Sequence, residues 1–378
     1  MLIPPFCPYA ECSNHTSLPL RKRWYHIAGR YETKLFGTVV RFKCLACGRT
    51  FSEQTFSLDY HVKRKLSYQR IFEHITNCGG LRATARFMGV THPAISNRIG
   101  RLARQAMALQ AELLSGFRLN EDLVTDGFES FVSDQYQPNN IHLLVGKASQ
   151  FLFTYDLSHL KRKGRMTDFQ KAERERREQE YIRERRSISD SFKQLVDAIE
   201  QLVLRREGEA TSLYSDQKPE YKQVIADSQV LQGLSKRGLF HHETISSKLE
   251  RTIYNPLFAV NYYDRELRKD NADHVRETVR FSRNVNNALE RLAVYQMYHN
   301  FFKPYRIADR ELKHFTHAEM AGMSRERIAQ GLEGIFSRRK FFSHVKLELN
   351  WSQITVWVRM MGTLDKHDGV YWADYVWM

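Results

Sequence analysis

The spacing of hydrophobic and polar residues changes along the chain, and these changes divide it into four regions. Residues 1–60 are rich in cysteine, aromatic and turn residues and contain strand-like runs such as GTVVRFK. Residues 61–116 carry apolar side chains at helical spacing. Residues 117–305 mix strand-like and helical runs, and residues 306–378 form a helical, tryptophan-rich C-terminal region. The pattern predicts a multidomain protein of the α+β class.

The third region has the most regular pattern. The runs LVTDGF, IHLLVGK and QFLFTYD are typical of three consecutive strands, and TSLYSD and FHHETIS predict two more. A charged stretch at about 157–188 follows the third strand, and an apolar helical stripe over 190–206 comes next. We therefore expect an α/β core with a charged helical insertion. This order of strands and helix is compatible with a ribonuclease-H-like sheet.

The net charge of the chain indicates what kind of partner it binds. The 378 residues include 58 Lys and Arg against 43 Asp and Glu, a formal charge of +15. Such a surplus favours a polyanionic partner through neutralisation of phosphates. No apolar stretch reaches the roughly 18 residues of a membrane-spanning helix, and the first residues, MLIPPFCPYAEC, lack the pattern of a signal peptide. We expect double-stranded DNA as the partner, no membrane, and a cytoplasmic location, with nucleoid association when DNA is bound.

Two close cysteine pairs predict a zinc site in the first region. The four candidate ligands are Cys7, Cys12, Cys44 and Cys47. Two short turns held together by a small sheet supply the tetrahedral sulfur ligands that zinc prefers. His15 or His26 could replace Cys12 if the first loop is arranged differently. Four protein ligands leave no position for water, so the sequence predicts a structural zinc ribbon.

The second region has the form of a helix-turn-helix. Ala83–Phe87 would be its first helix, Gly89 the turn, and His92–Arg104 the recognition helix. The residues that could reach base edges or phosphates are Ser96, Asn97, Arg98 and Arg101. An ordinary helical hairpin has a similar pattern. The adjacent zinc ribbon and the positive charge favour DNA binding.

Three acidic residues are candidates for catalysis in the third region. Asp126 ends one apolar run, Asp216 ends another, and Glu250 follows the last strand-like run. Asp126 and Asp216 would lie on neighbouring strands, and Glu250 would come from the following helix. Three such carboxylates can hold magnesium or manganese ions that clamp the oxygens of a phosphodiester.

Other acids compete for the third position. Asp156 ends the third predicted strand, and Glu277 and Glu290 lie on helical stretches. Glu290 requires a large insertion after the second acid, whereas Glu250 requires none. The spacing therefore favours Glu250.

Taken in order, CPYAEC…RFKCLACGRTF, LRATARFMGVTHPAISNRI and VTDGFES…YSDQKPEY…HHETISSKLERT…RETVRFSRN resemble the DDE transposases of bacterial insertion sequences. The chain is most similar to the insertion-sequence-one type, over roughly residues 5–305. The resemblance implies Mg²⁺- or Mn²⁺-dependent DNA cleavage at transposon ends and strand transfer to target DNA. It implies a catalytic triad of Asp126, Asp216 and Glu250 and an assembly of at least two subunits, and Lys248 and Arg251 become candidates for phosphate contacts.

The chain also departs from that family. Gln217 stands after the second acid where the family usually has glycine, and residues 161–186 form an insertion. Two other functions stay open: a non-catalytic DNA-binding regulator derived from a transposase, and a metal-dependent nuclease that does not join strands.

Overall fold

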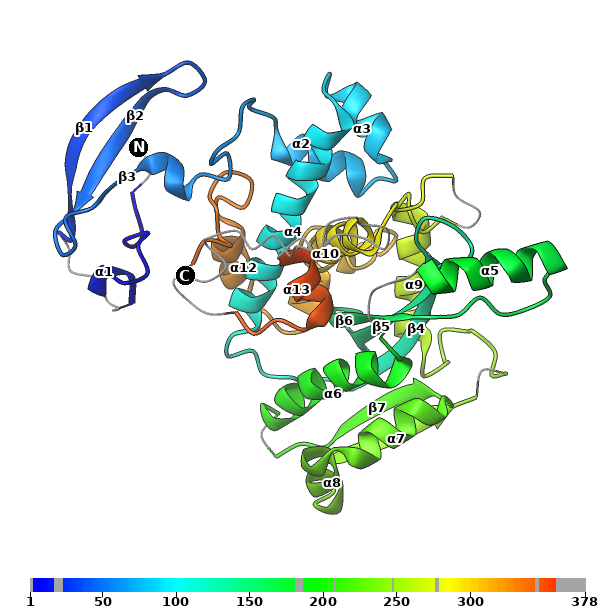
Figure 1. Cartoon of the computed structure of the whole chain (residues 1–378). Coiled ribbons are helices and arrows are strands. Elements are labelled where there is room, and N and C mark those ends of the chain that lie inside the picture. Colours follow the sequence, from blue (N-terminus) through cyan, green and yellow to red (C-terminus); the bar gives the residue numbers. More distant parts are fainter. Residues whose placement is uncertain are drawn as a thin grey trace.

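The computed structural model of the chain describes residues 3–16, 23–180, 186–206, 208–246, 248–275, 279–343 and 347–357. Within these residues the protein is a mixed α+β structure with two sheets (Figure 1). None of the described helices is both long and apolar enough to cross a membrane.

The N-terminal sheet has three antiparallel strands in the order β1-β2-β3, and it stands at the upper left of Figure 1. Its strands are β1 Tyr25–Thr33, β2 Gly37–Cys44 and β3 Thr50–Ser52. Gly37 closes the first hairpin with a φ of +67°, a conformation that glycine adopts without strain. Trp24, Phe42 and Phe51 form a small aromatic core with neighbouring cysteines. Phe342, from the far end of the chain, packs into the same core.

The central sheet has five strands in the order β6-β5-β4-β7-β8. They are β4 Leu123–Phe131, β5 Pro138–Gly146, β6 Leu152–His159, β7 Thr211–Asp216 and β8 Phe240–Ile245. The first three are antiparallel, whereas β7 is parallel to β4 and β8 is parallel to β7. Parallel neighbours need a crossover, and helices follow β6 and β7 for this reason. All five predicted strands are therefore present.

Helices cover both faces of the central sheet. They are α6 Ile188–Leu204, α7 Pro219–Asp227, α8 Gln229–Lys236 and α9 Phe258–Asp270. The predicted helix over 190–206 corresponds to α6, whose first turn is closed by a capping box between Ser187 and Asp190. His142 lies on the face of the sheet that α6 covers, where its ring contacts Ser191 of α6. Phe128 lies on the opposite face, where Arg268 of α9 lies over its ring. Strand β5 is buried along almost its whole length because both of its faces are covered.

A long helix connects the N-terminal half of the chain to this core. It is α4 His92–Leu114, preceded by α2 Tyr68–Ile75 and α3 Leu81–Phe87. The second half of α4 packs against α10 Val285–Phe301 and α12 Arg325–Leu332, as Figure 1 shows. The buried Gln105 donates hydrogen bonds to the carbonyls of Ile335 and Arg338, both at 2.7 Å. Its side chain therefore fixes the C-terminal segment on α4.

The remaining elements are short or peripheral. They are α1 Ser13–Thr16, η1 Glu53–Phe56, α5 Asp168–Glu180, η2 Leu312–His314, α11 His317–Met320 and α13 Trp351–Trp357. Helix α5 lies in the predicted charged insertion and extends away from the sheet on the right of Figure 1. Of the four tryptophans near the C-terminus, Trp357 is buried in the core, and Trp372 and Trp377 lie outside the described residues.

The apolar run that stops at Asp126 predicts that this residue ends its strand, and this prediction is wrong. Asp126 does not end its strand, because β4 continues for five more residues and pairs with β5 as far as Phe131. The apolar run stops at Asp126, yet the backbone ladder does not depend on side-chain polarity. Asp126 therefore lies in the middle of β4, opposite Leu143 of β5.

The buried His142 makes the free energy of unfolding depend on pH. Burial lowers the pKa of His142 from 6.5 to about 3, and the positive charges of Lys218 and Arg186 act in the same direction. The neutral ring lies 2.9 Å from the Ser191 hydroxyl and 2.7 Å from the Asn140 amide. Because its pKa is lowered on folding, the contribution of His142 is complete above about pH 6.5 and is lost as the pH falls toward 3.

We therefore expect His142→Gln to flatten the acid limb of the stability curve. The free energy of unfolding of the wild-type protein should fall more steeply between about pH 6 and 4, by about 1.4 kcal/mol per pH unit for this one group. Denaturant unfolding at a series of pH values measures the slope. The exposed His241→Gln is the matched control. Equal slopes for wild type and His142→Gln would contradict the argument.

Candidate functional site

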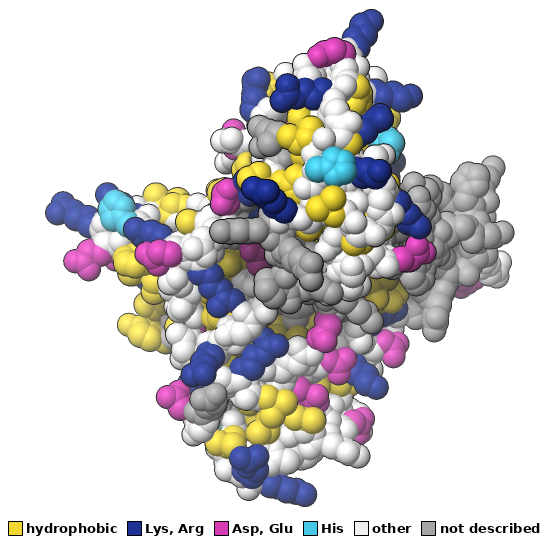
Figure 2. Space-filling view, turned by 90° about the vertical axis from the view of Figure 1, so that its left-hand side faces the viewer, with side chains coloured by type: hydrophobic (Ala, Val, Ile, Leu, Met, Phe, Trp, Pro, Cys, Tyr) yellow, Lys and Arg dark blue, Asp and Glu magenta, His cyan; other side chains and the backbone are white. Residues whose placement is uncertain are grey.

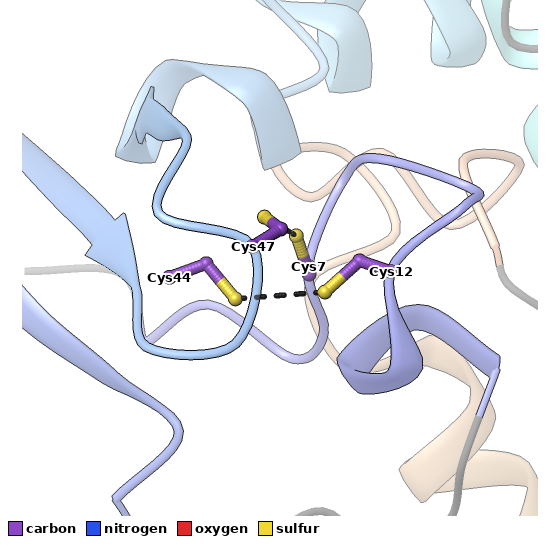
Figure 3. A group of neighbouring side chains, drawn as sticks. All are labelled: Cys7, Cys12, Cys44 and Cys47. Atoms are coloured by element: carbon purple, nitrogen blue, oxygen red, sulfur yellow. Dashed lines mark hydrogen bonds between the residues drawn. The ribbon is translucent and has the colours of Figure 1, made fainter.

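The four predicted zinc ligands come together in the N-terminal module (Figure 3). Cys7 and Cys12 come from the first loop, Cys44 ends β2, and Cys47 lies in the following turn. The four sulfur atoms all lie within 4.8 Å of one another, with 3.7 Å between Cys7 and Cys47 and 3.6 Å between Cys12 and Cys44. All four are free thiols rather than disulfides. The arrangement is compatible with a structural zinc site.

The surroundings of the thiols fit a bound cation. Burial opposes ionisation of Cys44, but hydrogen bonds from the Cys47 backbone and the Asn14 side chain outweigh it and lower the pKa of this thiol to about 7. The Asn14 amide lies 3.3 Å from the Cys44 sulfur. Such donors around a thiolate orient metal ligands. Burial raises the pKa of Cys7 and Cys12, so these two thiols need a metal to ionise at neutral pH.

Histidine does not replace Cys12. The His15 ring nitrogen Nδ1 lies 2.6 Å from the Cys7 carbonyl oxygen, so this nitrogen binds the backbone of the first loop. His26 is exposed on β1. The open alternative of the sequence is therefore settled in favour of four cysteines.

The second candidate site is a pair of carboxylates on the central sheet. Strands β4 and β7 are parallel neighbours, with Thr125 opposite Ser215, so Asp126 and Asp216 follow these paired residues on adjacent strands. The ammonium of Lys218 lies 3.6 Å from Asp126 Oδ1 and 3.2 Å from Asp216 Oδ2. About a fifth of each carboxylate-bearing side chain is exposed, 21% for Asp126 and 19% for Asp216. The pair is therefore open to solvent and already holds one positive charge.

The electrostatic surroundings of Asp126 show why the Lys218 ammonium is needed beside it. Burial raises the pKa of Asp126, the Lys218 ammonium lowers it, and the neighbouring Asp216 raises it again. The Gly127 backbone N–H also donates to Asp126 Oδ1 at 2.7 Å. Two carboxylates this close repel each other unless a cation lies between them. The pair can therefore hold a cation. Among the described residues, however, the four cysteines are the only group of three or more such ligands whose atoms all lie within 4.8 Å of one another, so no third acid lies that close to the pair.

A third acid, missed in the sequence, faces this pair from α9. The Arg268 guanidinium lies over the Phe128 ring at 4.4 Å, which fixes the direction in which this helix face points. Asp264 is one helical turn before Arg268, a rise of about 6 Å. Asp126 is two residues before Phe128 on the same face of β4, a step of about 6.8 Å. Asp264 therefore lies on the side of α9 that carries Arg268, and it is near enough to Asp126 for the charge of that carboxylate to raise its pKa.

The electrostatics of Asp264 agree with this geometry. Burial and, next, the charge of Asp126 raise the pKa of Asp264 to about 8, against the lowering effect of Arg268, Arg251 and Lys218. Its Oδ1 atom is enclosed and has no hydrogen-bond partner among the described residues, although the whole residue is only half-buried. An enclosed carboxylate oxygen beside a second carboxylate is the environment that a cation would relieve.

Glu250 does not lie where the sequence predicted. It is exposed in the loop after β8 and does not belong to a helix, because the next helix begins only at Phe258, after Pro256. Its backbone carbonyl accepts a hydrogen bond from Asn255 Nδ2 at 2.8 Å, which fixes the loop but not the carboxylate. Lys248 and Arg251 are exposed on the same loop. Arg251 is near enough to Asp264 to lower its pKa, so the loop borders the acid pair.

The competing acids have structural surroundings. Asp156 is fully buried and binds Arg186 at 2.8 Å and the Ser352 backbone N–H at 3.0 Å. Glu290 is buried on α10 and accepts a hydrogen bond from Asn286. Glu277 lies outside the described residues.

The helix-turn-helix residues divide into two groups. Helices α3 and α4 occupy the predicted positions, and Gly89 between them has a φ of +62°. Ser96 and Asn97 are half-buried near the start of α4. This placement leaves both residues as candidates for DNA contacts.

Arg98 and Arg101 instead bind the backbone of the protein. Arg98 is only 6% exposed and donates to the Arg64 carbonyl at 2.8 Å, and Arg101 donates to the Leu58 carbonyl at 2.6 Å. In this arrangement Arg98 is bound to the protein backbone, because the segment before α2 folds over this side of α4. The sequence could not show that contact.

Exposed cations near this helix were missed. Arg82 and Arg86 are exposed on α3, and the segment 63–65, with sequence KRK, is exposed before α2. The run of three cations was visible in the sequence. Lys and Arg side chains are also numerous over the upper part of the face shown in Figure 2, which looks onto the side where the N-terminal sheet lies. Exposed cations of that sheet include Arg30, Arg41 and Lys43.

Comparison with known proteins does not place the chain in a family. No family model matches it, and no curated protein matches it significantly.

Proposed function

We propose that the protein is a DNA transposase, whose central sheet carries out metal-dependent cleavage and transfer of DNA strands. One observation carries the proposal: Asp126 and Asp216 lie on adjacent parallel strands and share one cation, the Lys218 ammonium. The strand order β6-β5-β4-β7-β8, with three antiparallel strands followed by two parallel ones, supports a ribonuclease-H-like core. The resemblance noted in the sequence leads to the same class.

In this proposal Asp126, Asp216 and Asp264 hold the catalytic metal, Mg²⁺ or Mn²⁺. Carboxylate oxygens are the ligands that these ions prefer, and the enclosed Oδ1 of Asp264 supplies the third donor. Such ions activate an attacking oxygen and stabilise the leaving oxygen of a phosphodiester. Asp264 replaces Glu250 as the third acid because it is near enough to Asp126 to feel its charge, whereas Glu250 is exposed in the loop after β8. The exposed Lys248 and Arg251 side chains of the loop after β8 are suited to contact phosphates.

Sequence reading is assigned to α3 and the start of α4, with Ser96 and Asn97 at base edges and Arg86 on phosphates. The four-cysteine module adds a zinc-stabilised basic surface. A protein that joins two transposon ends is expected to act as a dimer or larger assembly. The experiment that tests the function incubates the full chain with duplexes that carry candidate ends and Mg²⁺ or Mn²⁺. Cleavage without joining would favour the nuclease, and binding without cleavage would favour the regulator.

Two arginines of this region should behave in opposite ways. We expect Arg86→Ala to weaken DNA binding and to reduce the salt dependence of log Kd by about one phosphate contact, without loss of stability. Arg98→Ala should lower the free energy of unfolding by about 1–3 kcal/mol, because it removes the buried guanidinium that donates to the Arg64 carbonyl. Fluorescence anisotropy at several salt concentrations and denaturant unfolding measure the two effects. The assignment fails if Arg98→Ala keeps full stability and loses only DNA binding.

A further inference from the structure

The Lys218 side chain has a defined place between the acids. Its backbone N–H donates to Asp216 Oδ1 at 3.3 Å, and the residue caps α7 directly before Pro219. The ammonium lies 5.1 Å from the centre of the Tyr221 ring and 3.4 Å from its hydroxyl. The stem is therefore guided by a backbone turn and an aromatic ring toward Asp126 and Asp216.

The ammonium and a divalent cation would need the same oxygens. A Mg²⁺ ion binds carboxylate oxygens at about 2.0–2.1 Å, and it must hold Asp126 and Asp216 together. The Lys218 ammonium already contacts one oxygen of each of these carboxylates, at 3.6 and 3.2 Å. An ammonium and a metal ion that both contact the same two carboxylates would lie only a few ångströms apart, and they would repel strongly in a partly buried site. The Lys218 ammonium and a metal ion therefore compete for the acid pair.

We propose that Lys218 is a resident counter-ion of the acid pair, which a divalent cation displaces and which then binds a phosphate oxygen of the DNA. The inference rests on the proposed function, because it requires that metal binds Asp126 and Asp216. The four-carbon stem of lysine allows the ammonium to move by several ångströms without a change in the backbone. Lys218 thus keeps the acids close while the metal is absent and becomes available when the metal arrives.

A Mn²⁺ titration of the zinc-loaded full chain tests the first half of this proposal. Free Mn²⁺ is followed by electron paramagnetic resonance for wild type, Lys218→Met, Lys222→Met and Asp126→Asn. Lys222 is the matched control because it is an exposed lysine on the same helix. We expect Lys218→Met to bind Mn²⁺ about tenfold more tightly than wild type, since the competing charge is gone. Its metal-free Tm should fall, and Mn²⁺ should raise that Tm more than it raises the wild-type value.

The outcomes separate the inference from the function on which it rests. If wild type and Asp126→Asn bind Mn²⁺ equally, the acid pair is not a metal site, and the proposed function and the inference both fail. If wild type binds more tightly than Asp126→Asn but Lys218→Met shows no gain, the metal site stands and the counter-ion role is overturned.

The second half is tested by binding of a pre-cut duplex end at saturating Mn²⁺, where no cleavage step intervenes. Lys218→Met should lose affinity several-fold, Lys218→Arg should keep most of it, and Lys222→Met should behave as wild type. Equal affinities for wild type and Lys218→Met would show that the displaced lysine does not reach the phosphate.

Discussion

Asp126→Asn and Asp216→Asn are each expected to lower the rate of metal-dependent DNA cleavage by at least about 10³-fold. Each substitution keeps the shape of the side chain but removes the negative charge that a divalent cation needs. The fold should be preserved, because both side chains are partly exposed and the backbones around them are held by strand pairing. Single-turnover cleavage of an end-containing duplex measures the effect, with zinc content and Tm as controls of folding.

The third acid can be identified by a matched pair of substitutions in the same assay. Asp264→Asn should resemble Asp126→Asn, whereas Glu250→Gln should stay within a few-fold of wild type. The physical reason is their placement: Asp264 is near enough to Asp126 for the charge of Asp126 to raise its pKa, and Glu250 is exposed in the loop after β8. If Glu250→Gln is inactive and Asp264→Asn is active, the loop must close over the pair when DNA binds, and the assignment made from this structure is wrong.

Cys12→Ser is expected to release zinc and to unfold the N-terminal module. Structural zinc contributes on the order of 10–16 kcal/mol of apparent binding free energy in small zinc modules. The aromatic core around Trp24 and Phe51 is too small to compensate for that loss. Metal analysis should show loss of zinc, and hydrogen exchange should show loss of protection in β1 and β2.

Cys78→Ser is the matched control for this experiment. Cys78 is the one cysteine outside the cluster, and it lies in the turn after α2, where its backbone N–H donates to the Asp270 carbonyl at 2.7 Å. This variant should keep its zinc and its exchange protection. Retention of zinc by Cys12→Ser would mean that three cysteines and another group hold the ion.

The sequence predicted what depends on local pattern. The five strands of the central sheet coincide with apolar runs of strand length, and the cysteines of each pair flank a short turn. The strands and the zinc ligands could therefore be located from residue spacing alone. The placement of Asp126 and Asp216 on neighbouring strands was expected from a ribonuclease-H-like order of strands and helix, and β7 pairs in parallel with β4.

What the sequence could not predict depends on contacts between distant segments. The role of Asp264 requires that one face of α9 lies on β4, which is fixed by Arg268 over Phe128. The burial of Arg98 requires that the segment before α2 folds back over α4. Glu250 was misplaced for a simpler reason: a charged stretch after a strand was taken as the start of a helix, whereas the helix begins after Pro256.

The length of α4 has a mechanical consequence. Its 23 residues span roughly 35 Å, about the length of ten base pairs of DNA. Its first turns belong to the surface assigned to sequence reading, and its later turns are embedded in the same core that supports the central sheet. In the proposed function, this one helix would set a fixed distance between the surface assigned to DNA reading and the core that carries the acids. A protein built in this way would tolerate little variation in the number of base pairs between its recognition sequence and its cut.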